Sequence, residues 1–382
     1  METLSINSHV YPVMRDSFWT NKQRQGHSLN EISYRACFKP QLVQYFIDRH
    51  SNEGEVVLDP FMGRGTTALQ SALSGRVAYG SDINPLSEML IRPRLSPPSI
   101  GAIVKRFRSI PNNAKITKTD EEMLVFYHPD TLRHLLSLKK WFIKQEKKGK
   151  LTLEDEWIRM VIMNRLSGHS SGFLSVKTMP PNQTISIDAQ RKINEKHNRK
   201  AEKKDVLDLI VKKSKSLLRS GTLPTLFPNK EHKLRCADAL NLDYIDDSEV
   251  DLMVTSPPFM DVVDYAGDNW LRCWFAGIDT DTIAFDDKHS SVESWSEFVR
   301  DAFKEFARVI RKGGIAAFEV GEVKGGSIKL EENVINAIGG LPFKVEEILV
   351  NEQTFTKTAN CWGVDNNAKG TNTNRIVLAR RV

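Results

Sequence analysis

The feature that most constrains the fold is a short apolar segment that ends in a carboxylate and runs into a glycine-rich turn. Residues 55–59, Glu-Val-Val-Leu-Asp, predict a strand, and Gly63 and Gly65 follow it before a helix that begins near Ala68. Glycines at such a turn permit tight bending and let a ligand approach the backbone closely. Strand, glycine turn and helix in this order predict an α/β protein with a Rossmann-like, doubly wound, mostly parallel sheet.

A second carboxylate stands at the end of the next predicted strand. Asp82 follows residues 76–81 and lies 23 residues after Asp59, where an acidic residue can accept hydrogen bonds from ribose hydroxyls. The turn lacks the GxGxxG pattern, and two carboxylates would repel a pyrophosphate. S-Adenosylmethionine has a ribose, an ammonium and a sulfonium group but no phosphate, so it fits better than a dinucleotide. The alternative is a generic turn of this fold without such a ligand.

The other informative stretch joins a strand, residues 250–254, to Ser256-Pro257-Pro258-Phe259. Two prolines end the strand because neither has an N–H group to donate. A small hydroxyl and an aromatic ring at the end of a strand fit one flat polar ring, such as a nucleobase turned out of a duplex. Taken alone, the same residues fit a rigid turn with a core aromatic.

Three segments together resemble the signature set of amino-directed DNA methyltransferases: residues 59–67, 82–85 and 255–259. The Ser-Pro-Pro-aromatic form is similar to the cytosine-N4 group, whereas adenine-N6 enzymes more often have Asp or Asn in place of Ser256. The resemblance covers roughly residues 30–95 and 230–320. It implies S-adenosylmethionine as cofactor, double-stranded DNA as partner, and methyl transfer to the exocyclic N4 amine of cytosine.

The resemblance also implies the cofactor-binding residues. It assigns residues 59–67 to the methionine moiety, Asp82 to the ribose and Asp238 to the region of the adenine amino group, although Asp238 could equally cap a helix. The full set is Phe38, Pro40, Asp59, Pro60, Phe61, Gly63, Gly65, Thr66, Asp82, Ile83, Asn84, Asp238 and Ala239.

The predicted catalytic residues are Ser256, Pro257, Pro258 and Phe259. The Ser256 hydroxyl and the Pro257 carbonyl can accept hydrogen bonds from an exocyclic amine, while Phe259 stacks on the flipped base. Positioning then contributes most of the rate, and the nitrogen attacks the methyl group directly. A carbon-5 route would need a thiolate nucleophile, usually after proline, and no cysteine here follows proline. No metal-binding constellation is present in the sequence.

The segment 101–230 separates a cofactor half, residues 1–100, from a catalytic half, residues 231–382. Its stretch 191–219 has a net charge of +7, which fits either a grip on DNA phosphates or a solvated helix face. We expect this insertion to recognise the target. The candidate DNA-binding residues are Arg165, Lys177, Asn182, Gln183, Arg199, Lys200, Lys203, Lys204, Lys212 and Lys213.

Composition sets the remaining expectations for this chain of 382 residues with a net charge of +6. Its four cysteines form no CxxC pair, and no signal peptide or membrane-length apolar run is evident. We therefore expect a cytoplasmic protein without a membrane partner. The resemblance implies a bacterial, archaeal or phage origin and a role in restriction-modification, with or without a cognate endonuclease. Oligomeric state is open. Residues 1–30 are expected to be irregular, and residues 343–350 and 375–380 to form an antiparallel edge pair.

Three rival functions are left open by the sequence. Adenine-N6 transfer to DNA is the nearest, and RNA methylation by an enzyme with the same cofactor cradle is the second. A nucleic-acid-binding protein that has lost its chemistry is the third, and it would have no need of the intact residues Asp59, Gly63 and Gly65.

Overall fold

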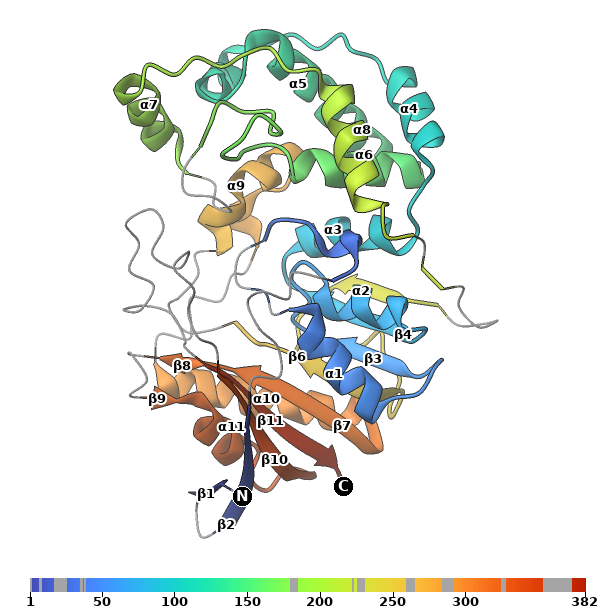
Figure 1. Ribbon diagram of the computed structural model, residues 1–382, viewed down its shortest axis with the longest axis vertical. Helices are drawn as coiled ribbons and strands as arrows, with labels where there is room; N and C mark the ends of the chain where they lie inside the picture. Colours follow the sequence, from blue (N-terminus) through green and yellow to red (C-terminus); the bar gives the residue numbers. More distant parts are fainter. Residues whose placement is uncertain are drawn as a thin grey trace.

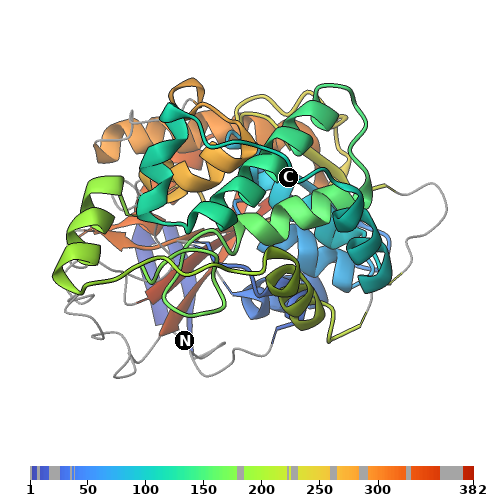
Figure 2. The ribbon, with the colours of Figure 1, turned by 90° about the horizontal axis from the view of Figure 1, so that it is seen from above.

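The computed structural model describes residues 2–6, 9–16, 26–34, 37, 39–178, 185–221, 223–224, 231–258, 265–283, 291–323, 328–352 and 373–382. These residues form an open sheet with helices on both faces and a layer of helices stacked above it (Figure 1). From above, the helical layer is seen in front of the sheet (Figure 2).

Parallel strands make up the centre of the sheet. Within the described residues the main sheet has the order β1-β2-β10-β11-β7-β6-β3-β4-β5. Strands β7, β6, β3, β4 and β5 run parallel, and β11 joins β7 in the antiparallel sense. This order confirms the predicted α/β class with a doubly wound, mostly parallel sheet. The strands are β1 (Glu2–Ile6), β2 (His9–Asp16), β3 (Val56–Asp59), β4 (Val77–Asp82), β5 (Lys233–Cys236), β6 (Val250–Thr255), β7 (Ile310–Val320), β10 (Phe343–Glu352) and β11 (Thr373–Arg381), with a separate pair β8 (Glu322–Val323) and β9 (Ile328–Lys329).

The prediction that residues 343–350 and 375–380 form the edge of the sheet was wrong. Strands β10 and β11 do pair antiparallel, but β10 is not at the edge, because the N-terminal hairpin β1–β2 adds to it. Residues 1–30 are therefore not uniformly irregular. Ile6 and Val13 are buried on the sheet, and pairing β2 with β10 satisfies backbone groups that an open edge would leave exposed. Strands β1 and β2 contain too few alternating apolar residues for the sequence to predict them as strands.

Amphipathic helices cover the two faces of the sheet. Helix α1 (Pro40–His50) begins with proline at its first position, and its apolar side packs on the face that includes Val254 and Ile376. Helix α2 (Thr66–Leu73) follows the glycine turn beside β3 and β4. Helices α10 (Val292–Val309) and α11 (Leu330–Ile338) pack on the opposite face.

The upper layer has a core of its own. Its largest buried side chains include Trp157, Phe142 and Phe275. The basic run 191–219 includes the end of α7, at Lys196, and the whole of α8, which begins at Val206. The layer contains α3 (Pro85–Leu95), α4 (Ile100–Ser109), α5 (Pro129–Glu146), α6 (Leu153–Met163), α7 (Ile187–Lys196), α8 (Val206–Leu217) and α9 (Tyr265–Ala276), with the 3-10 turns η1 (Ser28–Asn30), η2 (Lys118–Val125) and η3 (Thr280–Thr282). Among the described residues no helix combines the length and apolar character required to cross a membrane.

Candidate functional site

The glycine turn and the Ser-Pro-Pro stretch meet at the carboxyl ends of two central strands of the sheet. Strands β3 and β6 are parallel neighbours (Figure 1). Asp59 and Thr255 are their last residues. The Thr255 hydroxyl donates to Asp59 Oδ1 at 2.6 Å across 196 residues of sequence. Thr67, in the first turn of α2, donates to the carbonyl of Val254 at 3.0 Å. The glycine turn and the Ser-Pro-Pro stretch therefore belong to one site.

Asp59 is almost fully buried at this junction. Burial raises the pKa of its carboxyl to about 7, against hydrogen bonds from the Thr255 hydroxyl and the backbone N–H of Phe61. A buried carboxylate gains when a cation lies beside it, because the charged form is otherwise poorly solvated. The position thus favours a ligand with a positive group.

The glycine turn fixes the second carboxylate. Gly63 has a φ of +47° and its N–H donates to Asp82 Oδ2 at 2.8 Å, while Asn84 N–H donates to Oδ1 at 2.9 Å. Gly65 has a φ of +75°, and a Cβ there would lie 2.1 Å from Ile91 Cγ1. Gly65 is therefore required by helix packing as well as by backbone conformation, which the sequence interpretation did not anticipate.

Neighbouring predicted residues lie around the ends of β3 and β4. Pro60 is buried and Ile83 is half-buried, and Thr66 starts α2. Asn84 caps α3 by accepting from Leu86 N–H at 3.0 Å, and its Nδ2 is buried without a partner among the described groups. Phe61 turns toward α10, where it contacts Phe298 and Phe306.

The predicted adenine-side residues lie after β5. The Ala237 N–H donates to the Asp82 carbonyl at 3.1 Å, which holds this turn next to Asp82. Asp238 is exposed and accepts from Leu240 N–H at 2.9 Å, whereas Ala239 is buried. The structure therefore brings Asp238 to the same edge as Asp82.

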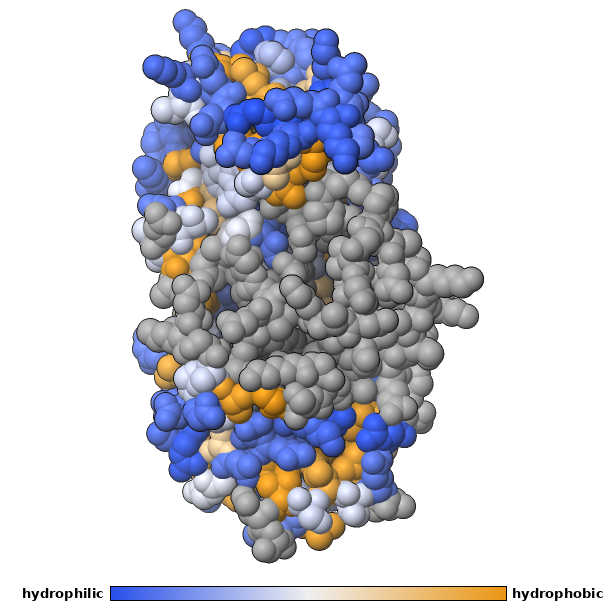
Figure 3. Space-filling model, turned by 90° about the vertical axis from the view of Figure 1, so that its left-hand side faces the viewer, coloured by the Kyte–Doolittle hydropathy of each residue, from blue (hydrophilic) through white to orange (hydrophobic). Residues whose placement is uncertain are grey.

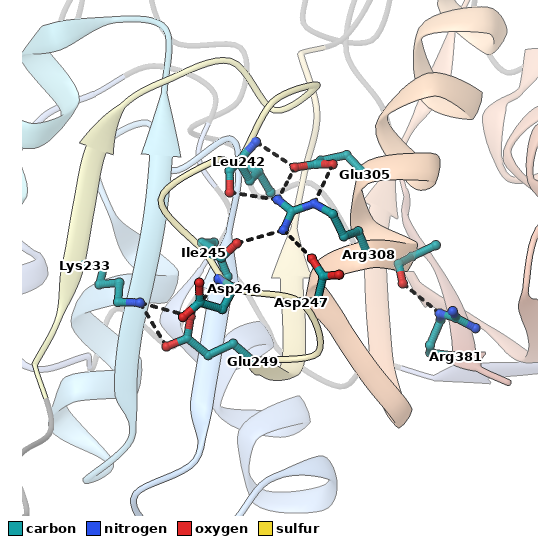
Figure 4. A network of polar contacts seen from close by, with 10 residues as sticks. Lys233, Leu242, Ile245, Asp246, Asp247, Glu249, Glu305, Arg308 and Arg381 are labelled. Carbon is teal, nitrogen blue, oxygen red and sulfur yellow. Dashed lines mark hydrogen bonds and ion pairs between the residues drawn. The ribbon is translucent and has the colours of Figure 1, made fainter.

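A polar network anchors the loop that follows Ala239 (Figure 4). Arg308 of α10 donates to the carbonyls of Leu242 and Ile245 at 2.9 and 2.8 Å and pairs with Asp247 at 2.9 Å. Glu305 accepts from Leu242 N–H at 2.8 Å. Helix α10, which packs on the face of the sheet away from α1, thus fixes the loop between β5 and β6.

An arm of residues 26–34 lies against the glycine turn. Arg94 is buried and donates to the carbonyls of Leu29 and Leu90 at 3.1 and 2.7 Å, while Arg64 donates to the Ile32 carbonyl at 3.0 Å. Both guanidinium groups are thus engaged with main-chain carbonyls. The Asn30 side chain is buried and has no partner for Oδ1 or Nδ2 among the described groups.

Asn30 was missed by sequence interpretation. A Cβ built on Gly26 would lie 3.7 Å from Asn30 Nδ2 and 3.2 Å from Pro40 Cγ. Asn30 is therefore near the start of α1, where Pro40 was predicted to flank the cofactor. Phe38 lies outside the described residues. A lone asparagine in a polar arm offers no pattern from which this place could be inferred.

The target end of the site is built around Ser256. Ser256 is half-buried and Pro257 is buried, and Trp295 Nε1 of α10 donates to the Pro258 carbonyl at 3.2 Å. Phe259 lies outside the described residues. The Ser256 hydroxyl donates to the carboxylate of Glu319, a residue of β7 that the sequence interpretation missed.

Glu319 is buried, and burial raises its pKa to about 7 against hydrogen bonds from Ser256 and Asn374. A glutamate inside the apolar strand 315–320 was a signal that could have identified it, because an unpaired charge is rarely buried.

Several of the predicted DNA-binding lysines form ion pairs within the upper helical layer. Lys203 pairs with Asp130 at 3.1 Å and Lys212 with Asp208 at 2.7 Å. Lys204 pairs with Glu202 at 3.0 Å. On the face shown in Figure 3 the upper helical layer is largely hydrophilic.

Other members of that set are tied to the main chain or stacked. Lys213 Nζ donates to the Glu31 carbonyl at 2.6 Å, and Arg199 Nη1 to the Lys177 carbonyl at 2.9 Å. Arg165 stacks over Phe173 at 4.3 Å from the ring centroid. Lys200 is exposed, and Asn182 and Gln183 lie outside the described residues.

Comparisons with known proteins find similarity to DNA methyltransferases. A family model described as DNA methylase, of the N6/N4 type, matches residues 8–90. The chain is 26% identical over 303 residues to type II methyltransferase M.BsoBI of Geobacillus stearothermophilus, covering 69% of this chain and 55% of that one. It is 35% identical over 96 residues to type II methyltransferase M.MjaII of Methanocaldococcus jannaschii, covering 25% of this chain and 18% of that one.

A shorter match reaches higher identity. The orphan methyltransferase M.BamHII of Bacillus amyloliquefaciens is 42% identical over 62 residues, covering 16% of this chain and 23% of that one. The chain thus spans little more than half of M.BsoBI and less of the other two. A solved geranyl diphosphate methyltransferase aligns with 90% of this chain and 85% of its own at 8% identity, with a TM-score of 0.36. The fold assignment therefore rests on the strand order itself.

Proposed function

We propose, because the chain belongs to the amino-directed DNA methyltransferase family, that it transfers a methyl group from S-adenosylmethionine to the exocyclic N4 amine of cytosine in double-stranded DNA. The observation that carries the proposal is the contact between Thr255 and Asp59, which joins the Ser-Pro-Pro stretch to the glycine turn. A donor held at the turn and a base held at Ser256 would be adjacent.

The residues present fit S-adenosylmethionine. Asp59 and Asp82 flank the turn, while the guanidinium groups of Arg64 and Arg94 are engaged with main-chain carbonyls. A ligand with cations and a ribose suits this charge pattern, whereas a diphosphate would meet two carboxylates. The buried side-chain amides of Asn30 and Asn84 supply further hydrogen-bonding groups for it.

The chain's own residues hold and orient the two reactants. Asp59 and Asp82 bind the donor, and the Ser256 hydroxyl and Pro257 carbonyl accept hydrogen bonds from the amine, with Phe259 stacking on the base. Bound S-adenosylmethionine would supply an electrophilic methyl group to the amine nitrogen. Orientation of this kind contributes several orders of magnitude in rate.

Cytosine is favoured over adenine by Ser256, since the adenine-N6 enzymes that the motif resembles more often have Asp or Asn there. The base would have to leave the duplex to reach a site at the sheet edge. Residues 101–230 would then recognise the target sequence, and the chain would act in restriction-modification. A cognate endonuclease would be the partner in that role.

Transfer of tritium from labelled S-adenosylmethionine tests the proposal. We expect label in duplex DNA and N4-methylcytosine in the nucleosides released from it, identified by mass spectrometry. Label in N6-methyladenine would move the target to adenine, and label only in RNA would overturn the choice of substrate. Sequencing that reports modified bases in expressing cells would define the recognised site.

A further inference from the structure

Four neighbouring strands end in polar residues on one face of the sheet. Ser256 follows β6, and Glu319, Asn374 and Asn351 lie on β7, β11 and β10. The strand register sets Thr255 opposite Phe318, Ile376 opposite Glu319 and Asn351 opposite Asn374. Because side chains alternate between faces, these residues point to the same side.

The face beneath this polar row is apolar. Two positions deeper into the sheet along each strand lie Val254, Ala317, Ile376 and Leu349, all of them buried in the cluster under α1. The row therefore marks the point where the core gives way to the site. Glu319 in particular is as buried as the apolar residues of the core.

Glu319 contacts side chains from both neighbouring strands. It accepts from the Ser256 hydroxyl on one side and from Asn374 Nδ2 on the other. The nearby ion pair between Arg375 and Glu331 belongs to the opposite face, since Arg375 is opposite Val320 in the register. Asp59 lies two strands away, bonded to Thr255.

A hydroxyl has one hydrogen to donate and two lone pairs that accept. With its hydrogen committed to Glu319, Ser256 Oγ offers only lone pairs to a bound base. An exocyclic amine can donate to those lone pairs, whereas a carbonyl oxygen at the same place would meet them unfavourably. A buried polar group that lacks a hydrogen-bond partner costs binding free energy.

We propose that Glu319 is a positioning residue that fixes the Ser256 hydroxyl as an acceptor, so that the site admits an exocyclic amine and rejects a carbonyl. This inference rests on the proposed function. Asn374 holds the carboxylate of Glu319 in the orientation that receives the Ser256 proton. A protonated Glu319 could instead donate to Ser256 and turn its hydrogen toward the base.

A double-mutant cycle tests whether Glu319 acts through Ser256. We expect Glu319→Gln to lower the single-turnover rate of methyl transfer about 10- to 100-fold, because the glutamine amide can donate to Ser256 Oγ. S-Adenosylmethionine affinity should hardly change. In a Ser256→Ala background the same substitution should cost little more. Full additivity of the two losses would overturn the inference.

The pH profile and a matched control separate positioning from folding. With S-adenosylmethionine saturating, so that protonation of Asp59 does not limit donor binding, wild-type transfer should fall as the pH drops through about 7 and Glu319 takes up a proton. Glu319→Asp should keep part of the rate and this acidic limb, and Glu319→Gln should lose the limb. Glu331→Gln removes a buried carboxylate from the other face of β11 and should leave the limb intact. An unchanged limb in Glu319→Gln would overturn the inference.

Base preference gives a readout without turnover. Duplexes that carry cytosine or uracil at the modified position would be compared by fluorescence anisotropy. We expect wild type to prefer cytosine by about tenfold, and Glu319→Gln to narrow that preference. A wild-type chain that methylates no nucleic acid would overturn the proposed function and the inference together. An active wild type with an unaltered preference in Glu319→Gln would overturn the inference alone.

Discussion

Asp59 and Glu319 are two buried carboxyl groups at the same edge of the sheet, and burial raises the pKa of each to about 7. Their partners differ. Asp59 accepts from the backbone N–H of Phe61 and from the Thr255 hydroxyl under the glycine turn. Glu319 accepts from Ser256 and Asn374 on adjacent strands. The comparison shows that similar burial can serve different tasks, one facing a cationic donor and the other acting behind a hydroxyl.

The largest expected effect is on methyl transfer, and it distinguishes Ser256 at the base end of the site from Asp59 at the donor end. Ser256→Ala should lower methyl transfer by about 100-fold or more while S-adenosylmethionine binding persists, because the amine loses an acceptor. Asp59→Asn keeps the shape but removes the charge, so it should weaken S-adenosylmethionine binding about tenfold. Isothermal titration calorimetry and tritium transfer measure the two effects.

The opposite outcome would break this division. If Ser256→Ala weakened S-adenosylmethionine binding as much as Asp59→Asn did, the two carboxyl groups would not serve separate reactants. Phe259→Ala, which removes the predicted stacking ring, should follow Ser256→Ala rather than Asp59→Asn.

Both carboxyl groups should affect the free energy of unfolding in the same way as the pH changes. The unfolded chain ionises them near their ordinary pKa values of 3.8 and 4.5, whereas the folded chain holds both protons until about pH 7. The free energy of unfolding should therefore fall as the pH rises from about 4 to 7 and level off above that. Each pKa unit corresponds to about 1.4 kcal/mol.

Urea denaturation at pH 5 and pH 8 measures this effect. The fall between the two pH values should be smaller in Asp59→Asn and in Glu319→Gln than in wild type. Parallel curves for wild type and both variants would show that these carboxyls keep their ordinary pKa values in the folded chain.

The smallest expected effect concerns the helical layer. Replacing Lys203, Lys204, Lys212 and Lys213 by Gln should reduce the salt slope of DNA binding by about 1 for each lysine that contacts a phosphate. The ion pairs of Lys203 and Lys212 are no obstacle, because an exposed pair contributes only about 0–1 kcal/mol. Lys304→Gln, which breaks an exposed pair with Asp301 on α10, is the matched control. An unchanged slope in the fourfold variant would leave these lysines as a solvated surface.

The difference between these regions explains what local sequence could predict. At Gly63 the backbone conformation itself requires glycine, and at Asp82 a strand ends in a carboxylate, so a short segment encodes its structure. The basic run carries no such constraint, because lysine is accepted almost anywhere on a solvated helix. Its charge was evident from the sequence, but the partners of Lys203 and Lys213 depend on helices α5 and α8 and on the arm.

The sequence by itself determined the fold class, the glycine turn at 63–65 and the strand that leads to Ser256, because periodicity and glycine or proline stereochemistry act over a few residues. Only the tertiary structure decided that β1–β2 extends the sheet, that Asn30 lies near Pro40, and that Glu319 and Asn374 stand behind Ser256. Those relations depend on which strands pair and in which register, and register is set by packing across the whole sheet.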